Sequence, residues 1–529
     1  MTENQIKKEL QENEAVKIAK DDKIKGLRLL IGYLGIFVTF VGLAMMLPSL
    51  VALFYREEVS YIKYFIIPGS ACVIGGLILY CNIVKKSRSQ LKKGEDSVLL
   101  VSIWIVSTIL CSIPFMYGLN MNFTHAIFET TSGLTTTGLT VVKPESTPRM
   151  FLMYRSLLQF LGGVGLVLII TATISDRYGL RLYSAEGHGD KLLPNMAKSA
   201  RMILGIYVIY ILLGTVAYSI LGMPVFDSLN HSISAIATGG FSVKNASIGA
   251  YAYLGEGRFL GIQIVSCVLM ILGSTNFLVH AYLFRRKFKN ALMHSEHMLV
   301  LINFLIAVPI FIIPLRMLSD YSVSESFRIG LFQLISSYTT TGYQVIPDIA
   351  ALPTSIIFMT TILMFIGGEA GSTAGGVKQI RVVSFLKGIV WDVKKTINKG
   401  RVIETHFINQ AGKYVEITDT DRKRNNDFFL IMIVITIIAT LIITCFGYDA
   451  QSALFEVASA FSSSGLSVGV ATYDAHPVVL WTISIIMFLG RLEIYVVFYA
   501  FVRMFQLSKD SWIYTKRMRE MSKKNKTNA

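Results

Sequence analysis

The sequence predicts an all-α polytopic membrane protein, with a leading two-helix hairpin followed by four membrane–pore–membrane repeats around one central pore. Two observations predict this class. Of the 529 residues, 53% are hydrophobic and only 16% are charged, whereas soluble domains carry about 25% charged residues. Long apolar runs also recur, most of them close to the ~20 residues that cross a bilayer core. These runs are Gly26–Phe54, Tyr61–Val84, Ser97–Leu119, Phe151–Ile174, Ala200–Leu221, Arg258–Phe284, Met298–Met317, Ser355–Ile366, Phe428–Phe446 and Val478–Phe505.

The positive residues predict the orientation of these spans. Residues 1–25 lack an apolar core and are not a cleaved signal peptide, so we expect a cytoplasmic tail. Lys and Arg cluster in alternate connections, at 85–93, 177–201, 285–289 and 378–424, and again after 509. Because Lys and Arg near span ends stay in the cytoplasm, both termini are expected there. The net charge of +16 lies between apolar runs, so it does not indicate nucleic-acid binding.

One motif recurs in the outer half of each expected repeat, where a short amphipathic stretch ends in hydroxyl residues and a glycine. Its copies are FETTSGLTTTG at 128–138, LNHSISAIATG at 229–239, FQLISSYTTTG at 332–342 and FEVASAFSSSG at 455–465. The aligned glycines are Gly138, Gly239, Gly342 and Gly465. A second glycine register follows in the next span, at Gly162, Gly273, Gly367 and Gly490. A single copy is explained by an ordinary polar turn, whereas four registered copies indicate an internal repeat.

Each motif is too short to cross the membrane. A dozen residues form a helix of ~18 Å, so the stretch should dip in from outside and turn back. Non-helical backbone at membrane depth is tolerated where it is buried in protein or lines a water-filled cavity. The helix would aim its partially negative C-terminal end at that cavity. Carbonyl oxygens that replace a hydration shell are the arrangement that selects potassium, so the repeats predict a monovalent-cation pore.

These patterns divide the chain into seven segments. We expect a cytoplasmic tail at 1–25, a leading transmembrane hairpin at 26–96, pore repeat one at 97–197, pore repeat two at 198–295, pore repeat three at 296–426, pore repeat four at 427–508 and a basic cytoplasmic tail at 509–529. The third repeat includes a glycine-rich loop at 367–376 and a basic cytoplasmic connection after it.

The motifs TTTGLT, ATGGFS, TTTGY and SSGLS, with FLGGVG, AGSTAGGVK and GRLE, resemble the TrkH/KtrB membrane subunits of bacterial potassium uptake systems, and the leading hairpin is more similar to the TrkH branch. The resemblance covers about 97–506 and implies potassium uptake across the bacterial inner membrane, in a homodimer gated by a cytoplasmic nucleotide-binding ring of the TrkA/KtrA type. It implies K⁺ as the transported ion, with no organic cofactor in this chain. The implied K⁺-binding filter residues are Thr136, Thr137, Gly138, Ala237, Thr238, Gly239, Thr340, Thr341, Gly342, Ser463, Ser464 and Gly465.

A glycine-rich segment interrupts the last apolar run of the third repeat. Residues 367–376 hold five glycines, each less favourable in a helix by about 1 kcal/mol than alanine. We expect a mobile plug below the filter, and the alternative is a kink for close helix packing. The resemblance implies an intramembrane gating loop, formed by Gly371, Ser372, Thr373, Ala374, Gly375 and Gly376.

Arg491 lies in the last long run, far from either end. A lone arginine at that depth should face the pore or a polar partner. Our hypothesis is that Arg491 forms a positive barrier that holds the closed state, with the free carbonyls of the loop as its partners. The alternative is a structural ion pair with Glu369 or another acid.

Two other function classes remain to be weighed. A secondary transporter coupled to H⁺ or Na⁺ would need buried carboxylates, for which Glu129, Glu369 and Glu456 are the candidates. An intramembrane enzyme would need one asymmetric Ser/His or Asp/Asp constellation, and the sequence contains none that we recognise. The five cysteines lack CxxC spacing, so neither disulfides nor a cysteine metal site is expected. We therefore expect a transporter and not an enzyme.

Overall fold

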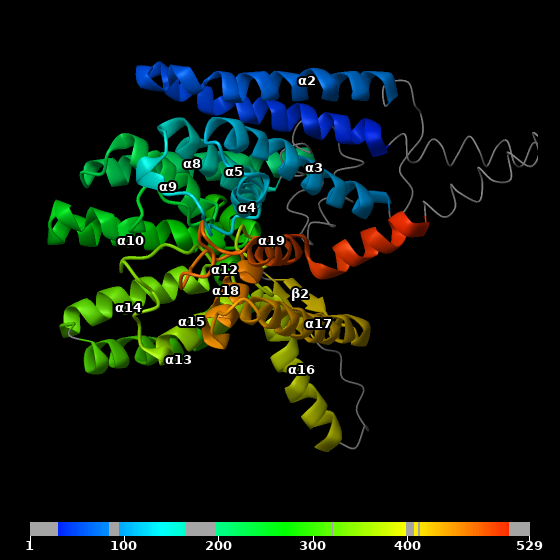
Figure 1. Ribbon diagram of the computed structural model, residues 1–529. Coiled ribbons are helices and arrows are strands. Elements are labelled where there is room, and N and C mark those ends of the chain that lie inside the picture. Colours follow the sequence, from blue (N-terminus) through cyan, green and yellow to red (C-terminus); the bar gives the residue numbers. More distant parts are fainter. Residues whose placement is uncertain are drawn as a thin grey trace, which may run out of the picture. The chain divides into compact units, whose positions relative to one another are not determined.

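The computed structural model describes residues 30–83, 95–165, 196–319, 321–397, 407–410 and 413–506 (Figure 1). The predicted tails at 1–25 and 509–529 and the basic connection at 85–93 lie outside these residues. The described residues form two compact parts. The first part holds 30–46, 67–83, 95–110 and 495–506. The second part holds the described residues of 47–66 and 111–494.

The first compact part contains most of the two helices of the leading hairpin. It holds the helix Leu30–Leu53 as far as Met46 and α2 (Lys63–Ile83) from Ile67 onward. The 3-10 turn η1 (Leu47–Leu53) and the start of α2 belong to the other part. Glycines let the two helices touch, because a Cβ on Gly42 would lie 2.6 Å from the carbonyl oxygen of Gly69. A second close contact lies about two helical turns away. There a Cβ on Gly35 would lie 2.7 Å from the carbonyl oxygen of Gly76. Small residues at such contacts allow helix backbones to approach closely.

Four units of the chain share one pattern of a long helix, a short helix and a further helix. The long helix of the first unit, α3 (Glu95–Gly118), begins in the first compact part and ends in the second. The short helices α4, α9, α14 and α18 have 12, 12, 16 and 13 residues, so each falls short of the ~20 residues of a span. The four units are α3 (Glu95–Gly118), α4 (Phe123–Leu134) and α5 (Arg149–Val164); α8 (Met196–Ile220), α9 (Val225–Ile236) and α10 (Glu256–Ser274); α13 (Ser295–Leu318), α14 (Val323–Tyr338) and α15 (Thr354–Ile366); and α17 (Asp419–Thr444), α18 (Ala450–Ser462) and α19 (Pro477–Leu492).

Capping residues explain where the short helices begin. Asn122 accepts a hydrogen bond from the backbone N–H of His125 at 2.9 Å and starts α4. Ser322 and Glu325 form a reciprocal capping box at the start of α14, and Asp449 caps α18 by accepting from the N–H of Ser452 at 2.9 Å. Side-chain caps of this kind satisfy backbone donors that have no partner within the helix.

The four units contact each other in a closed order. The last helix of each unit touches the short helix of the next: α5 contacts α9, α10 contacts α14, α15 contacts α18, and α19 returns to α4. Figure 1 follows this order by colour, from the cyan α4 to the orange α18. The four units therefore contact one another in a ring.

Two expected spans are broken. The run 258–284 divides into α10 and α11 (Phe277–Phe284), because Asn276 caps α11 by accepting from the N–H of Leu278 at 2.7 Å. The run 478–505 divides after α19, where Glu493 has a φ of 60° and a further helix, Ile494–Gln506, begins. By length and hydropathy, the described residues contain seven helices able to cross a membrane, or eight if that broken pair is one span. The run 151–174 is helical to Val164, and 166–174 lie outside the described residues.

The connections add short elements to the helices. They include the 3-10 turns η2 (Arg56–Tyr61), η3 (Pro144–Ser146) and η4 (Ser247–Leu254) and the helices α12 (Phe288–Leu292) and α16 (Gln379–Ile397). The basic connection also holds an antiparallel hairpin of β1 (Phe407–Gln410) and β2 (Lys413–Glu416), in which Phe407 pairs with Glu416. The all-helical prediction did not include this hairpin.

Candidate functional site

The short helices all end in the same turn. A non-glycine residue adopts the left-handed conformation after each helix: Thr136, Thr238, Thr340 and Ser463, with φ between 48° and 57°. The next residue donates its N–H back to a carbonyl five residues earlier, in the pairs Thr137 to Ser132, Gly239 to Ser234, Thr341 to Ser336 and Ser464 to Ser459, at 2.9 to 3.1 Å. This is the Schellman arrangement. Left-handed Thr and Ser cost about 1–3 kcal/mol each and are typical of functional sites.

A glycine with positive φ follows each turn. These glycines are Gly138, Gly240, Gly342 and Gly465, with φ of 93°, 73°, 86° and 82°. The predicted equivalence of Gly239 with the other three is therefore wrong by one residue. Gly239 occupies the place of Thr137, Thr341 and Ser464, and Gly240 occupies the glycine place. Ala237 correspondingly caps the end of α9, as Thr135 caps the end of α4.

The four glycines lie directly against neighbouring carbonyl groups. A Cβ on Gly138 would overlap the carbonyl oxygen of Gly239. The same relation continues around the ring, from Gly240 to the oxygen of Thr341, from Gly342 to that of Ser464 and from Gly465 to that of Thr137. Both the positive φ and the lack of space require glycine at these positions. Four carbonyl-bearing segments consequently close into one ring.

A cavity of about 340 Å³ opens on this ring. All four glycines, Gly138, Gly240, Gly342 and Gly465, lie in its wall, and the segments that follow them form the rest of the lining. The charged side chains in the wall are Arg155, Lys244 and Asp348. The cavity therefore connects the carbonyl ring with the loops that join the short helices to the next helix.

Polar side chains on the short helices hold these post-glycine segments. Glu129 accepts from Thr140 Oγ1 at 2.9 Å, and Glu456 accepts from Ser467 Oγ at 2.8 Å. In the second unit a ring nitrogen of His231 lies 3.0 Å from Ser242 Oγ. Each pair is separated by eleven residues. This spacing independently supports the corrected register, because it places Gly240 at the same distance from its anchor as Gly138 and Gly465.

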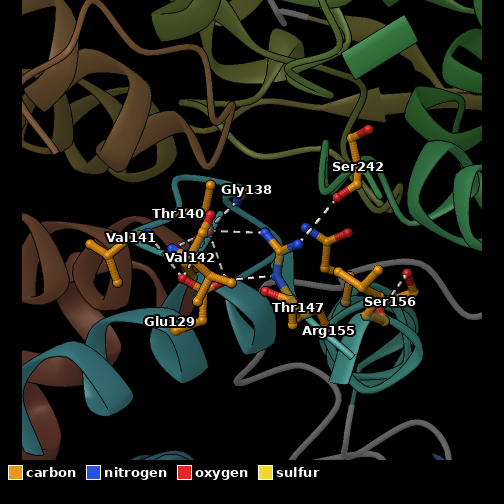
Figure 2. Close-up of polar contacts among 12 residues, drawn as sticks. Glu129, Gly138, Thr140, Val141, Val142, Thr147, Arg155, Ser156 and Ser242 are labelled. Carbon is orange, nitrogen blue, oxygen red and sulfur yellow. Dashed lines mark hydrogen bonds and ion pairs between the residues drawn. The ribbon is translucent and has the colours of Figure 1, made fainter. Parts of the chain in front are cut away.

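A buried ion pair strengthens the first of these anchors (Figure 2). Arg155 Nε donates to Glu129 Oε1 at 2.7 Å, and the two side chains are 2% and 0% exposed. The same guanidinium donates to Thr140 Oγ1 at 2.9 Å and to the carbonyl oxygen of Ser242 at 3.1 Å. Arg155 thus joins the post-glycine segments of the first and second units.

The second glycine register packs against the turns from the other side. A Cβ on Gly162 or Gly490 would overlap the carbonyl oxygen of Leu134 or Phe461. A Cβ on Gly273 would lie 2.6 Å from that of Ile236. These carbonyls belong to the last residues of the short helices or their final turn. In the third unit Gly367 instead touches Gly375 and Gly376 of its own loop.

The loop between α15 and α16 lies against the turns and the break after α10. The Thr373 N–H and Oγ1 donate to the carbonyl oxygen of Gly273 at 3.2 and 2.8 Å. Thr373 Oγ1 also lies 3.2 Å from Thr238 Oγ1, and the N–H of Gly375 donates to Thr340 Oγ1 at 2.8 Å. The loop therefore contacts the left-handed hydroxyl residues of two units. The other predicted loop residues lie beside these contacts: Gly371 accepts from the N–H of Phe277, Ser372 donates to Glu369, Ala374 accepts from Lys378, and Gly376 packs on Gly367.

Arg491 lies in the last turn of α19 and contacts two other units. Its Nη1 donates to the carbonyl oxygen of Thr373 at 3.0 Å. Its Nη2 donates to the carbonyl oxygens of Gly162 and Gly163, the latter at 3.2 Å. The neighbouring Glu493 pairs with Arg381 of α16 at 2.7 Å. Arg491 thereby connects α19, the end of α5 and the loop.

Comparison with known proteins identifies the family. The family model TrkH, described as a cation transport protein, matches residues 65–511. The chain belongs to the TrkH family. It is 30% identical to the Trk system potassium uptake protein TrkG of Escherichia coli (strain K12), over 88% of this chain and 96% of that protein. It is 28% identical to the Trk system potassium uptake protein TrkH of Halomonas elongata, over 90% of this chain and 99% of that protein.

A solved structure extends the likeness to the fold. The crystal structure of the potassium transporter TrkH from Vibrio parahaemolyticus matches with a TM-score of 0.78 at 26% identity, over 89% of this chain and 98% of that chain. Membership of the TrkH family also places the chain among transporters and not among enzymes.

Sequence reasoning missed three residues of the candidate site. Gly240 was not recognised because the adjacent Gly239 was aligned in its place. The hydroxyl of Ser242, eleven residues after His231, could have located it. Asn276 breaks the inner helix of the second unit, and the preceding Gly-Ser-Thr is a recognisable stop signal. Gln159 donates from Nε2 to the carbonyl oxygen of Gly239 and accepts from Ser234 at 2.7 Å. No local pattern identifies that contact, because its partners lie in another unit.

Proposed function

We propose that this chain mediates potassium uptake across the cytoplasmic membrane, as a channel-like protein whose ions pass through the ring of turns. The proposed filter is formed by 136–138, 238–240, 340–342 and 463–465. The observation that carries the proposal is the closed ring in which each positive-φ glycine lies against a carbonyl of the next unit. Rings of backbone carbonyls replace the hydration shell of K⁺. Relatives named as potassium uptake proteins support the choice of ion.

The short helices favour a cation at this ring. Each of α4, α9, α14 and α18 ends at its turn, and the four turns touch one another, so four helix C-termini lie at the ring. A helix C-terminus carries the equivalent of roughly half a negative charge. A monovalent cation in the ring is thereby stabilised without a fixed carboxylate.

We further propose that 367–376 is the gate. The loop bonds to Thr238 and Thr340, which belong to the turns that would carry the ion. Arg491 holds the loop at Thr373 and places its positive charge beside the same contacts. A cation approaching the loop would meet that charge in a medium of low dielectric constant, where repulsion is strong. Conduction then requires both the loop and Arg491 to move.

The partner and assembly are part of the same proposal. A cytoplasmic nucleotide-binding ring of the TrkA/KtrA type would control the gate by pulling on α16, which follows the loop directly. The chain would act as a homodimer in the bacterial inner membrane, with both termini in the cytoplasm. K⁺ is the cargo of this path, and the proposal gives the chain no organic cofactor.

Coupled transport with H⁺ or Na⁺ is the second candidate, and the contacts of its carboxylates do not favour it. Glu129 is paired with Arg155, and Glu456 accepts from Ser467 and from the N–H groups of Val468 and Ala471. Glu369 accepts from the N–H of Asn276 at 2.8 Å. Each carboxylate therefore accepts hydrogen bonds that hold a loop in place, and these bonds explain its burial without proton transport.

A flux assay tests the proposal. The purified chain in liposomes should take up rubidium along its own gradient, and sodium should compete weakly. Gly240→Ser and Gly138→Ser should each lower the K⁺/Na⁺ ratio. Uptake that requires a pH gradient would contradict the channel proposal and indicate coupled transport. An unchanged K⁺/Na⁺ ratio in both variants would show that the ring of turns does not select the ion.

A further inference from the structure

Four ionisable side chains gather where the loop begins, outside the proposed ion path. One ligand atom from each of His294, Glu296 and Glu369 lies within 4.8 Å of the others. His297 adds a fourth group, with Nε2 at 3.1 Å from Glu369 Oε1. The two imidazole rings are 5.4 Å apart. Among the bonds between described residues, those of the two histidines are separate from the ring of turns and from the Arg491 contacts.

The cluster joins three parts of the chain. His294 directly precedes α13, and Glu296 and His297 lie in its first turn. Glu369 belongs to the loop and bonds to Asn276, which follows the break after α10. The side chains of Glu296, His294 and Glu369 are 0%, 3% and 5% exposed, whereas that of His297 is 32% exposed. The cluster is therefore buried with one accessible member.

Backbone groups already hold one oxygen of each carboxylate. Glu369 Oε2 accepts from the N–H of Asn276 at 2.8 Å, and Glu296 Oε1 accepts from the N–H of Ala370 at 3.2 Å. The other oxygen of each faces an imidazole: Glu296 Oε2 lies 3.2 Å from His294 Nε2. Metal-binding carboxylates are typically oriented by such bonds, with one oxygen left to the ion.

The tautomer of His297 points in the same direction. Its Nδ1 lies 3.4 Å from the carbonyl oxygen of Leu292, which can only accept, so Nδ1 carries the proton of a neutral ring. Nε2 then faces the Glu369 oxygen at 3.1 Å, where either a proton on Nε2 or a metal ion between the two atoms satisfies both of them. A divalent ion with two carboxylates and two neutral imidazoles has no net charge, which suits a buried site.

We propose that His294, Glu296, His297 and Glu369 bind a divalent transition metal of the Zn²⁺ class, and that the ion fastens the loop to α13. Imidazole and carboxylate together suit Zn²⁺, whereas Mg²⁺ prefers oxygen ligands in octahedral geometry. Zinc ligands at about 2.0–2.1 Å from the ion lie about 3.4 Å from each other. The ligand atoms of His294, Glu296 and Glu369, which lie within 4.8 Å of one another, must therefore draw together, and His297 must turn toward them. The proposal that these residues bind a metal does not depend on the proposed function. The proposed effect of the metal on flux does, because it assumes that the loop is the gate.

Binding is tested on the full chain in detergent. Cys81 and Cys445 are exposed and are first changed to Ser, so that their thiols do not bind zinc. Dialysis against buffered Zn²⁺ and elemental analysis should give one zinc per chain, and Mg²⁺ should not compete. His294→Ala and Glu369→Gln should each weaken binding at least tenfold, as should the milder His297→Gln at the partly exposed position. His476→Ala, at an exposed histidine outside the cluster, should bind like the parent. Equal binding by all variants, or none by the parent, overturns the site.

Flux tests the clamp separately. Zinc buffered on both sides of the liposomes should reduce rubidium uptake severalfold in the parent and in His476→Ala, and a chelator should restore it. His297→Gln should conduct equally with and without zinc. Zinc that binds without changing the flux overturns the clamp and leaves the site. Failure of rubidium uptake in zinc-free parent protein contradicts the proposed function instead, so the two failures are distinguishable.

Discussion

Arg491 donates from Nη1 to the carbonyl oxygen of Thr373 at 3.0 Å, so the last turn of α19 is tied to the middle of the loop. The second nitrogen of the same guanidinium binds the end of α5 through Gly162 and Gly163. One side chain thus joins three units below the ring of turns. Charge-assisted bonds of this kind are stronger than those between neutral groups, so their loss should release the loop.

We expect Arg491→Ala to raise rubidium flux in liposomes without any regulatory partner. The substitution removes both the bonds to the loop and the positive charge beside it. Arg503→Ala is the matched control, because Arg503 contacts Gln506 on an exposed helix surface and not the loop. Equal or lower flux in well-folded Arg491→Ala protein would show that Arg491 does not hold the gate closed.

Neighbouring glycines in the second unit should respond differently to the same substitution. Gly240 has a φ of 73°, and a Cβ there would overlap the backbone oxygen of Thr341, which cannot move away. A Cβ on Gly239 meets the end of the Gln159 side chain, which can rotate. We expect Gly240→Ser to lower the K⁺/Na⁺ ratio more than Gly239→Ser. Competition of sodium with rubidium uptake measures the ratio, and the reverse order would restore the register aligned on Gly239.

That register also shows how far the sequence determines the site. The four motifs were recognisable because left-handed turns and crowded carbonyls restrict the residues that fit, and Gly138, Gly342 and Gly465 do occupy equivalent positions in the turns. The second copy has two adjacent glycines, and Leu229 and Asn230 imitate Phe128 and Glu129 one position too early. The contact of His231 with Ser242 settles the alignment, but it depends on three-dimensional proximity.

The broken helices illustrate a different limit. Hydropathy predicted one span at 258–284, because the residues on both sides of Asn276 are apolar. The break is stabilised by the loop of another unit: Phe277 N–H donates to the carbonyl oxygen of Gly371 at 2.8 Å, and Glu369 N–H donates to that of Ser274 at 3.1 Å. Backbone groups freed within a helix are satisfied by a distant segment. A window of one sequence does not contain that partner.

Thr373→Val should increase basal flux less than Arg491→Ala does. Valine has nearly the same shape but removes the hydroxyl that donates to the carbonyl oxygens of Gly273 and Ile236 at 2.8 and 3.0 Å. The backbone bonds of residue 373 remain, so the loop should loosen only in part. Thr361→Val is the control, because the Thr361 hydroxyl donates within its own helix α15, to the carbonyl oxygen of Ile357. Identical flux in the two variants would contradict a role of the Thr373 hydroxyl in closure.

Two arginines on α5 should differ in their effect on stability. Arg155 and Glu129 are buried, and removing one member of a buried pair costs about 3–5 kcal/mol because the other charge is left without compensation. Arg149 and Glu57 are paired at 2.9 Å, but with 46% and 65% of their side chains exposed, and such pairs contribute about 0–1 kcal/mol. We expect Arg155→Met to lower the apparent unfolding temperature in detergent clearly and Arg149→Met to leave it nearly unchanged.

The double variant Glu129→Gln with Arg155→Met separates the ion pair from packing. Because it leaves no unpaired buried charge, it should recover part of the stability lost in Arg155→Met. The Thr140 and Val141 donors, which now bond to the Glu129 carboxylate, would still find the amide oxygen of the substituted side chain, so the post-glycine segment should stay anchored. A double variant that is less stable than Arg155→Met alone would mean that Glu129 is held by its hydroxyl and backbone partners and does not depend on the arginine.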